Sequence, residues 1–304
     1  MVRLKKQLFL LGLPVAAFAC VMSFTGCAGS PAPIVDQPQG AVAFCATDSP
    51  TPAEAAAVEI QLASRGGGGS GTTQINIPVY VHVITGGAGE GNILDSTIAT
   101  QMNVLNNAYA GTQSPGGFNT PFRFTLVSVD RTANSVWFTC ERDSADEVAM
   151  KTALRRGSAD DLNLYIRDLP AGLMGYGGFP WWYASNPAMD GPTLDYTGMP
   201  GGADAQFNLG DLAVHEIGHW AGLYHTFEGG CTTTGDYVSD TPAQARYNWS
   251  CPTGTIDTCT GAGFKGADPT MNFMDYTTDS CKWQFTKEQS ARMSNAWATY
   301  RAGK

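Results

Sequence analysis

The stretch HEIGHWAGLYH, His215–His225, holds three of the four histidines of this 304-residue chain. His215 and His219 are four positions apart, so on a helix their rings leave the same face. Gly222 would end that helix, because glycine tolerates the positive φ of a turn, and His225 would then return toward the pair from another direction. Three imidazoles that meet from two elements leave one tetrahedral position open, as in a catalytic zinc site.

The helix expected to carry this pattern runs through Leu212–Gly222, with Asn208 or Asp211 as its N-cap. Glu216 follows the first histidine and would lie beside the pair. The pattern H-E-x-x-H alone occurs in unrelated helices, where the histidines are hydrogen-bonded or solvated side chains. The additional glycine and the third histidine make the match much more demanding. We therefore interpret the window as a metal site with one open position.

Strand and helix patterns alternate upstream of this window. Three runs of β-branched or alternating apolar residues predict strands: 75–84, 122–130 and 162–169. Two runs predict helices: 95–109, with Asp95 or Ser96 as its cap and a stripe of Ile98, Met102, Leu105 and Tyr109, and 146–157, ended by Gly157. Alternation of this kind indicates an α/β layer with a largely parallel sheet.

The acidic composition limits the classes of partner. The formal net charge is −9, and a nucleic-acid binder needs a basic face for the phosphates, so we expect no nucleic-acid partner. The length allows one large domain or two small ones. We expect the protein to be a monomer.

The N-terminus predicts an export signal over residues 1–27. A basic start, MVRLKK, precedes a long apolar run. The end of that run, FTGC at Phe24–Cys27, is similar to a bacterial lipobox, in which the cysteine is lipidated, although Phe24 stands where leucine is usual. Lipidation at Cys27, ordinary signal cleavage nearby and a retained membrane anchor stay open. The protein is expected to be secreted or a cell-surface lipoprotein that meets a membrane only through this N-terminus.

Residues 28–71 are expected to be a tether or pro-segment ahead of a catalytic domain that spans residues 72–304. Their alanine- and glutamate-rich part would form a short helix. The glycine-rich run Gly66–Gly71 is typical of a flexible linker. Arg65, just before the linker, offers an exposed bond to a protease.

Six cysteines lie beyond the signal, and export makes disulfides their natural interpretation. Four of them follow the histidine window in a stretch that is poor in periodic apolar residues, so two bridges would replace the missing core. A four-cysteine zinc site is the weaker alternative, because the spacings are wide and lack a C-x-x-C pair. The six are Cys45, Cys140, Cys231, Cys251, Cys259 and Cys281.

The histidine window fits the metzincin signature H-E-x-x-H-x-x-G-x-x-H, and MNFMDY downstream supplies a methionine turn with Met274. With the segments GDYVSDTP, NFMDYTTDSC and FTKEQSARM, the chain resembles the pappalysin family of secreted metalloproteases from about Ile77 to Met293. The resemblance implies an α/β, metzincin-type zincin fold: a twisted mixed sheet with a backing helix and an active-site helix. An upper subdomain to about Gly222 would precede a small irregular lower subdomain, 223–304, with a terminal helix.

The sequence also indicates a terminal helix and an edge strand. Thr286 and Gln289 form a capping box for the terminal helix, which continues with a stripe of Met293, Trp297 and Tyr300. The run LMGYGGFPWW, Leu173–Trp182, would supply the edge strand along which an extended substrate adds. A plain loop is the alternative there.

The resemblance implies an exported zinc endopeptidase with His215, His219 and His225 as ligands. Glu216 would be the general base that takes a proton from zinc-bound water and passes it to the leaving amine. Tyr276 would steady the oxyanion.

Met274 would form a hydrophobic floor beneath the metal. The resemblance also implies that the substrates are proteins and peptides. It further implies the disulfides Cys231–Cys259 and Cys251–Cys281.

Cys45 and Cys140 are then left, and a bridge between them is the favoured outcome. The alternative is a zymogen in which the Cys45 thiolate fills the open zinc position until cleavage around Arg65 releases the segment. Some relatives carry an R-x-C-G motif in their pro-segment. The sequence around Cys45 is AFCAT, which lacks both the arginine and the glycine.

Two further site expectations rest on loop acids. Asp236, Asp240 and Thr241 offer oxygen ligands for structural calcium, and solvated loop acids are the equal alternative. Asp279 would lie near the pocket that receives the residue after the scissile bond, where a carboxylate favours lysine or arginine.

Two other functions compete with the protease. One is a non-catalytic surface lipoprotein that binds peptides or metal, and the presence of Glu216 and Tyr276 argues against it. The other is a zinc hydrolase that acts on a non-peptide amide. The natural substrate does not follow from the sequence.

Overall fold

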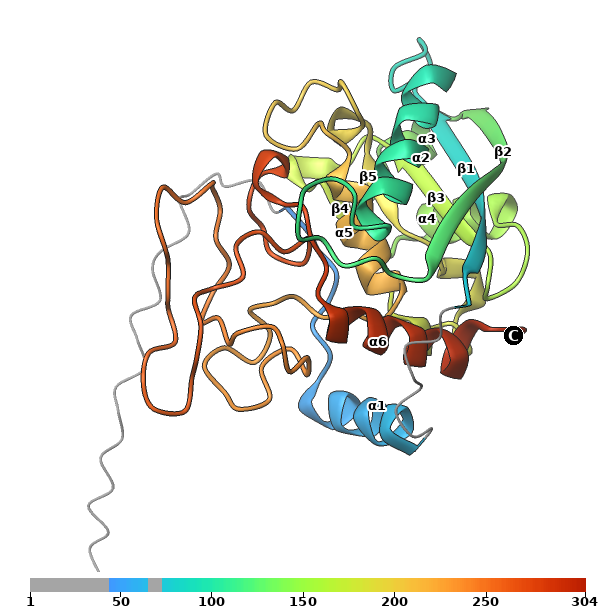
Figure 1. The fold of residues 1–304 in the computed structure, drawn as a ribbon. Coiled ribbons are helices and arrows are strands. Elements are labelled where there is room, and N and C mark those ends of the chain that lie inside the picture. The colour runs from blue at the N-terminus through green and yellow to red at the C-terminus, as the bar shows by residue number, and fades with distance from the viewer. Residues whose placement is uncertain (1–43, 65–72) are drawn as a thin grey trace, which may run out of the picture. The chain divides into compact units, whose positions relative to one another are not determined.

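The computed structural model describes residues 44–64 and 73–304. The expected signal over 1–27, Arg65 and the glycine-rich linker lie outside the described residues. The described part contains a five-stranded sheet with the order β2-β1-β3-β5-β4, whose strands are labelled in Figure 1. Its strands are β1 Ile75–Thr85, β2 Phe122–Ala133, β3 Leu162–Arg167, β4 Gly175–Tyr176 and β5 Thr193–Asp195. Only β4, at the edge, runs antiparallel to its neighbour, so the expected α/β fold with a largely parallel sheet is confirmed.

Six helices accompany the sheet in the described residues. They are α1 Pro52–Ser64, α2 Asp95–Tyr109, α3 Ser135–Phe138, α4 Ala145–Leu154, α5 Asp211–Trp220 and α6 Lys287–Ala296, which continues as a π-helical turn over Trp297–Arg301. Short 3-10 turns occupy Pro170–Gly172, Pro180–Trp182, Pro187–Met189, Tyr196–Gly198 and Asp279–Cys281. None of these described helices is both long and apolar enough to cross a lipid bilayer.

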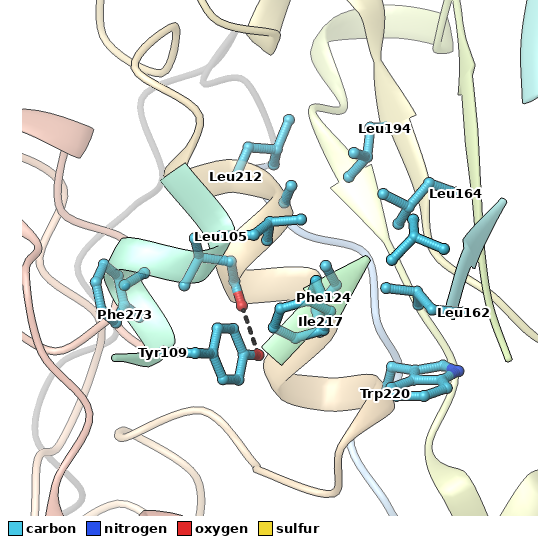
Figure 2. Close-up of a cluster of buried hydrophobic side chains, with 14 of the residues drawn as sticks. Leu105, Tyr109, Phe124, Leu162, Leu164, Leu194, Leu212, Ile217, Trp220 and Phe273 are labelled. Carbon is cyan, nitrogen blue, oxygen red and sulfur yellow. Dashed lines mark hydrogen bonds between the residues drawn. The ribbon is translucent and has the colours of Figure 1, made fainter. Parts of the chain in front are cut away.

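Alternation along the strands sorts the core onto the two faces of the sheet. On β3, Leu164 packs into the main cluster with α2 and α5, whereas the next residue, Tyr165, packs with Met150 of α4 in a second cluster. Figure 2 shows the main cluster, in which Leu105 of α2 and Ile217 of α5 meet the strand residues. The Tyr109 hydroxyl adds a 3.4 Å hydrogen bond to the Val214 carbonyl of α5. The sheet and α2 therefore hold α5 from two sides.

Two of the three expected helix caps differ in the structure. The capping box of Thr286 and Gln289 at α6 is confirmed. Helix α2 begins after Leu94 without a side-chain cap, and α5 begins after Gly210, whose φ is 102°. The expected caps Asp95 or Ser96 for α2, and Asn208 or Asp211 for α5, are therefore wrong.

The N-terminal segment 44–64 is packed on the fold. Its alanine-rich part forms α1, as expected, and α1 lies beside α6 (Figure 1). Val58 and Leu62 of α1 pack against Ala296. The Glu59 carboxylate accepts two hydrogen bonds from the Arg292 guanidinium, at 2.7 and 2.9 Å. These described residues are therefore part of the packed body and not a free tether.

Residues between α5 and α6 contain little regular structure and are cross-linked instead. The bridges are Cys231–Cys259 and Cys251–Cys281, the pairing that the family resemblance implies. These four cysteines therefore do not form a zinc site. The remaining two described cysteines, Cys45 and Cys140, are both free.

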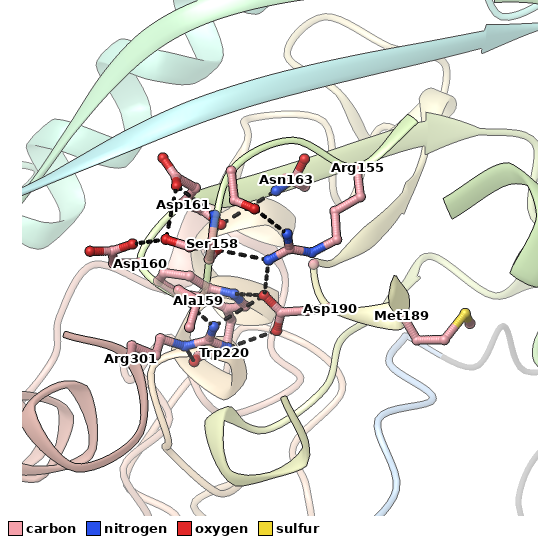
Figure 3. A network of polar contacts seen from close by, with 12 residues as sticks. Arg155, Ser158, Ala159, Asp160, Asp161, Asn163, Met189, Asp190, Trp220 and Arg301 are labelled. Carbon is pink, nitrogen blue, oxygen red and sulfur yellow. Dashed lines mark hydrogen bonds and ion pairs between the residues drawn. The ribbon is translucent and has the colours of Figure 1, made fainter. Parts of the chain in front are cut away.

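A buried polar cluster joins the C-terminal turn to the end of α5 (Figure 3). Asp190 is its centre. Its carboxylate accepts hydrogen bonds from Arg301 at 2.9 and 3.1 Å and from the Trp220 indole at 3.2 Å. The Arg155 guanidinium lies 3.7 Å away. The Arg301 Nε also donates to the Trp220 carbonyl at 2.9 Å, so this buried cluster fixes the C-terminal end of α5.

Candidate metal centre

Three histidine side chains converge at the C-terminal half of α5. His215 and His219 leave the same face of the helix, and Gly222, with a φ of 104°, turns the chain back toward them. His219 Nε2 lies 3.2 Å from His215 Nε2 and 3.0 Å from His225 Nε2. The three nitrogens therefore face one point, as the spacing in the sequence predicts. The fourth histidine, His82, lies in β1.

Backbone carbonyls orient two of these rings. His215 Nδ1 lies 2.7 Å from the Phe273 carbonyl, and His219 Nδ1 lies 2.8 Å from the Leu223 carbonyl. A carbonyl can only accept, so each Nδ1 carries the proton and each Nε2 keeps a lone pair for a metal. Burial lowers the pKa of His219 to about 4 and also lowers the pKa of His215 and His225. Neutral imidazoles are the form that binds metal.

Cys45 occupies the fourth position around this point. Its Sγ lies 3.7 Å from His219 Nε2, and the ligand atoms of Cys45 and the three histidines all lie within 4.8 Å of one another. Three imidazole nitrogens and one thiol are a donor set that suits tetrahedral zinc, so the residues present fit that metal.

The favoured bridge between Cys45 and Cys140 is therefore wrong. The Cys140 thiol instead donates to the Trp137 carbonyl at 3.3 Å. The physical reason is long-range strand pairing. Residues 44–46 pair with the edge strand β4, which places Cys45 beside the histidines, and both cysteines stay free.

The edge strand holds the N-terminal segment by its backbone. Ala46 N donates to Gly175 O at 3.0 Å, and Gly175 N donates to Phe44 O at 3.1 Å. Gly177 N donates to the Thr47 hydroxyl at 2.8 Å. The expectation of an edge strand within LMGYGGFPWW is confirmed at β4. A Cβ on Gly175 would lie 2.9 Å from Glu216 Oε1, so glycine lets this strand pass close to the acid.

Glu216 is fully buried beside the histidines. Its Oε2 accepts hydrogen bonds from the Cys45 thiol at 3.6 Å and the Thr47 hydroxyl at 3.1 Å. Its Oε1 has no hydrogen-bond partner in the part of the chain that the structure describes. Burial raises the pKa of Glu216 to about 8. The carboxyl is thus placed to exchange a proton with a group at the metal position.

The methionine turn places two more predicted residues. Met274 is fully buried beneath α5, and a Cβ on Gly218 would lie 2.4 Å from its sulfur. The Tyr276 hydroxyl donates to the Cys45 carbonyl at 3.2 Å, and its ring centroid lies 5.7 Å from that of His215. Tyr276 can therefore reach a carbonyl oxygen that lies next to the metal position.

Asp279 lies at the start of α5. Its Oδ2 accepts hydrogen bonds from the backbone N–H groups of Leu209, Gly210 and Asp211, at 3.0, 3.2 and 3.2 Å. Its Oδ1 lies 3.5 Å from Lys282 Nζ. This carboxylate replaces the local caps that the sequence suggested, because it satisfies N–H groups that a helix start leaves free.

The three residues expected at a calcium site separate into two groups. Asp236 Oδ1 accepts hydrogen bonds from the Thr241 hydroxyl at 2.6 Å and from Val238 N at 3.1 Å. The Asp240 carboxylate instead accepts from the Thr286 hydroxyl at 2.6 Å and Glu288 N at 3.0 Å, at the start of α6. Calcium binding stays a prediction.

Sequence reasoning missed several residues that contact the site. Phe44 and Thr47 flank the thiol, and the Arg142 guanidinium donates to the Ala46 carbonyl and the Asp48 carboxylate. Lys282 was missed as well. Only Lys282 left a readable local signal, since it lies three residues after Asp279.

Known proteins resemble this chain in sequence and structure. The peptidase family described as pregnancy-associated plasma protein-A matches residues 155–298. An extracellular metalloprotease of Pyricularia oryzae is 47% identical over 229 residues, 74% of this chain and 76% of that protein. An extracellular metalloprotease of Verticillium alfalfae is 44% identical over 231 residues, with shares of 74% and 76%.

Solved structures of mirolysin from Tannerella forsythia share the fold. A promirolysin mutant matches with a TM-score of 0.68 and 28% identity, covering 81% of this chain and 88% of that one. Mature mirolysin in complex with a cleaved peptide matches with a TM-score of 0.62 and 31% identity, covering 73% and 90%.

Proposed function

This chain belongs to the pappalysin family of zinc metalloendopeptidases, and on that premise we propose that it is exported as a zymogen. In this zymogen Cys45 blocks the metal centre and Glu216 is the general base. The observation that carries the proposal is the Cys45 thiol, which lies 3.7 Å from His219 Nε2 at the point where three histidines converge. The word extracellular in the names of the fungal relatives supports export.

The catalytic roles follow from which groups face the metal position. His215, His219 and His225 would hold zinc, which would supply Lewis-acid chemistry toward the water nucleophile and the scissile carbonyl. Glu216 accepts a proton from the attacking water and returns it to the leaving amine. Tyr276 donates a hydrogen bond to the oxygen that gains negative charge, in the place where it now contacts the Cys45 carbonyl.

Latency follows from what residues 44–47 occupy. Their backbone pairs with β4, the Cys45 thiol fills the fourth ligand position, and the Thr47 hydroxyl bonds Glu216. A substrate cannot reach the base or the edge strand until this segment leaves.

The test uses the zinc-loaded full chain and four variants. They are Cys45→Ala, Cys140→Ala as the matched free cysteine, Glu216→Ala, and Cys45→Ala combined with Glu216→Ala. Mass spectrometry of an unfolded carrier protein after incubation records the cleaved bonds. We expect Cys45→Ala to cleave at least about tenfold faster than the wild type and Cys140→Ala, because only Cys45 blocks the metal position. Loss of Glu216 should lower cleavage by about 10²–10⁴-fold.

Two results would contradict the proposal at different points. Equal activity of the wild type and Cys45→Ala would refute latency through the thiol. Folded, zinc-loaded Cys45→Ala that cleaves nothing would favour a protein that binds peptide or metal without turnover.

A further inference from the structure

The Phe44 side chain lies in a pocket formed by side chains beside His215, one of the expected metal ligands. Its side chain is fully buried although it lies in the segment that would be released. Its ring centroid lies 4.9 Å from that of His215, 5.2 Å from that of Tyr276 and 4.7 Å from that of Phe207. Phe44 is the residue next to Cys45, so its ring stands where a substrate side chain next to the cleaved bond would lie.

Lys282 is another residue that lines this pocket. Its Nζ lies 4.3 Å from the centroid of the Phe44 ring and 5.7 Å from that of Phe207. The Lys282 side chain is fully buried, and its Nζ has no hydrogen-bond partner in the part of the chain that the structure describes. A buried ammonium without hydrogen bonds is costly unless charge or an aromatic face compensates it. Asp279 and the Phe44 ring supply that compensation.

The charge of Asp279 is already balanced from within the chain. Its Oδ2 is taken by three backbone N–H groups, and its Oδ1 faces Lys282 Nζ at 3.5 Å. Asp211 is the other acid beside Asp279, and its Oδ1 accepts a 3.0 Å hydrogen bond from Gln113. Burial, and then the neighbouring Asp279, raise the pKa of Asp211 to about 7, so it carries only part of a negative charge near neutral pH.

We propose that Lys282 makes this pocket select an aromatic side chain next to the cleaved bond and reject lysine and arginine. The inference rests on the proposed function, because it concerns the substrate of the same site. It also replaces the expectation that Asp279 selects basic residues: Lys282 already occupies the place beside that carboxylate.

Two physical effects act in the same direction. An aromatic ring that enters the pocket repeats the contacts of Phe44 with Phe207 and Tyr276, and it gives the Lys282 ammonium a cation–π partner in a buried site. A lysine or arginine would bring a second cation toward Lys282 in a low-dielectric environment, where like charges repel strongly. Selection thus comes from attraction and repulsion together.

The first test measures occupancy of the pocket without any catalysis. It uses the zinc-bound full chain with Glu216→Ala, to prevent self-cleavage, and Cys140→Ser, to leave Cys45 as the only free thiol among the described cysteines. In this background, Phe44 is kept or replaced as Phe44→Tyr, Phe44→Met or Phe44→Arg. Each of these four proteins is prepared with Lys282 and with Lys282→Met. The readout is the rate at which a small thiol reagent modifies Cys45, which requires the segment to open. Lys287→Met, at an exposed lysine, is the matched control.

We expect Phe44→Tyr to stay within about threefold of Phe44, because the aromatic contacts persist. Phe44→Arg should raise the modification rate at least about tenfold when Lys282 is present, and more than the uncharged Phe44→Met. Lys282→Met should remove most of the penalty for arginine, whereas Lys287→Met should not. The inference would be overturned if Cys45 reacted equally slowly with arginine and with phenylalanine at position 44 in the protein that keeps Lys282. It would also be overturned if Lys282→Met left the faster reaction of Phe44→Arg unchanged. Circular dichroism of each variant shows that it is folded.

The second test maps cleaved bonds with the full-chain Cys45→Ala protein. We expect aromatic residues next to the cleaved bonds, and Lys282→Met should shift the ratio of basic to aromatic sites at least about tenfold toward basic. Cleavage beside lysine or arginine by the Lys282 protein would overturn the inference. A complete lack of cleavage would instead count against the proposed protease function, while the thiol test still decides the chemistry of the pocket.

Discussion

Gly218 is the residue at which the active-site helix and the methionine turn come closest. A Cβ there would lie 2.4 Å from the Met274 sulfur, and Met274 is fully buried. Gly218→Ala should therefore push the methionine away and destabilise the protein by about 1–3 kcal/mol. It should also weaken zinc binding, because His215 and His219 lie on the same helix. Urea unfolding and zinc titration of the full chain measure the two effects.

Gly254→Ala is the control for that substitution, because nothing lies within 4 Å of the added Cβ. In the double variant Gly218→Ala with Met274→Ala, the two costs should be less than additive, since the smaller side chain leaves room for the new methyl group. Full additivity would contradict the proposed contact.

Asp236 makes the stability of the folded protein depend on pH. Burial raises its pKa to about 7, against 3.8 for an ordinary aspartate, and its Oδ2 has no hydrogen-bond partner among the described residues. A raised pKa means that the folded protein favours the protonated form. The contribution of Asp236 to stability is thus present below pH 4 and is lost as the pH rises through 7, on the order of 1.4 kcal/mol per pH unit within that window.

Urea midpoints from pH 4 to 8 test this, with Asp236→Asn as the matched variant. We expect the difference in stability between wild type and variant to change across the window, in favour of the variant at high pH. A constant difference would refute the shifted pKa. Calcium would reverse the trend, because a cation favours the carboxylate. A midpoint at pH 7 that rises with calcium in the wild type alone would support the calcium prediction.

Helix ends show why some elements could be predicted from sequence and others could not. The capping box of α6 is local, with Thr286 and Gln289 three residues apart, so it is readable in the sequence. The start of α5 is stabilised by the Asp279 carboxylate, about seventy residues later in the chain. No window around α5 contains that information, so local reasoning proposed Asn208 or Asp211 instead.

Helix α1 anchors the N-terminal segment that blocks the site. Its Glu59 pairs with Arg292 through two hydrogen bonds, at 2.7 and 2.9 Å, and the Arg292 side chain is almost fully buried. Glu59→Ala should loosen α1 and raise the rate of Cys45 modification by a thiol reagent about five- to thirtyfold, because a partly buried ion pair contributes about 1–2 kcal/mol.

Glu141→Ala, at an exposed acid outside α1, is the control. Both proteins should carry Glu216→Ala, so that released segments are not degraded. If Glu59→Ala and Glu141→Ala react at the same rate, α1 does not contribute to closure of the site.

At the scale of the whole molecule, the three zinc ligands could be predicted because one helix and one turn place them. His215, His219 and His225 lie within eleven residues, and Gly222 supplies the turn. The fourth ligand could be named only as an alternative, since Cys45 reaches that position through strand pairing with Gly175, 130 residues away. From the sequence, a disulfide between Cys45 and Cys140 was the favoured outcome. The pairing of distant segments in the fold decides between that disulfide and a position of Cys45 beside the histidines, and this pairing cannot be read from a local stretch of sequence.

The Asp190 cluster ties the C-terminal turn to the helix that carries the site, and its loss should lower the stability of the whole fold. Asp190 and Arg301 are almost completely buried and form two hydrogen bonds. Asp190→Ala would leave the Arg301 guanidinium buried without its carboxylate, which costs about 3–5 kcal/mol. Arg131→Ala, which breaks the exposed pair with Asp95, should cost no more than about 1 kcal/mol. Urea unfolding of both variants at pH 7 measures the difference, and equal losses would show that the Asp190 cluster contributes no more than a surface ion pair.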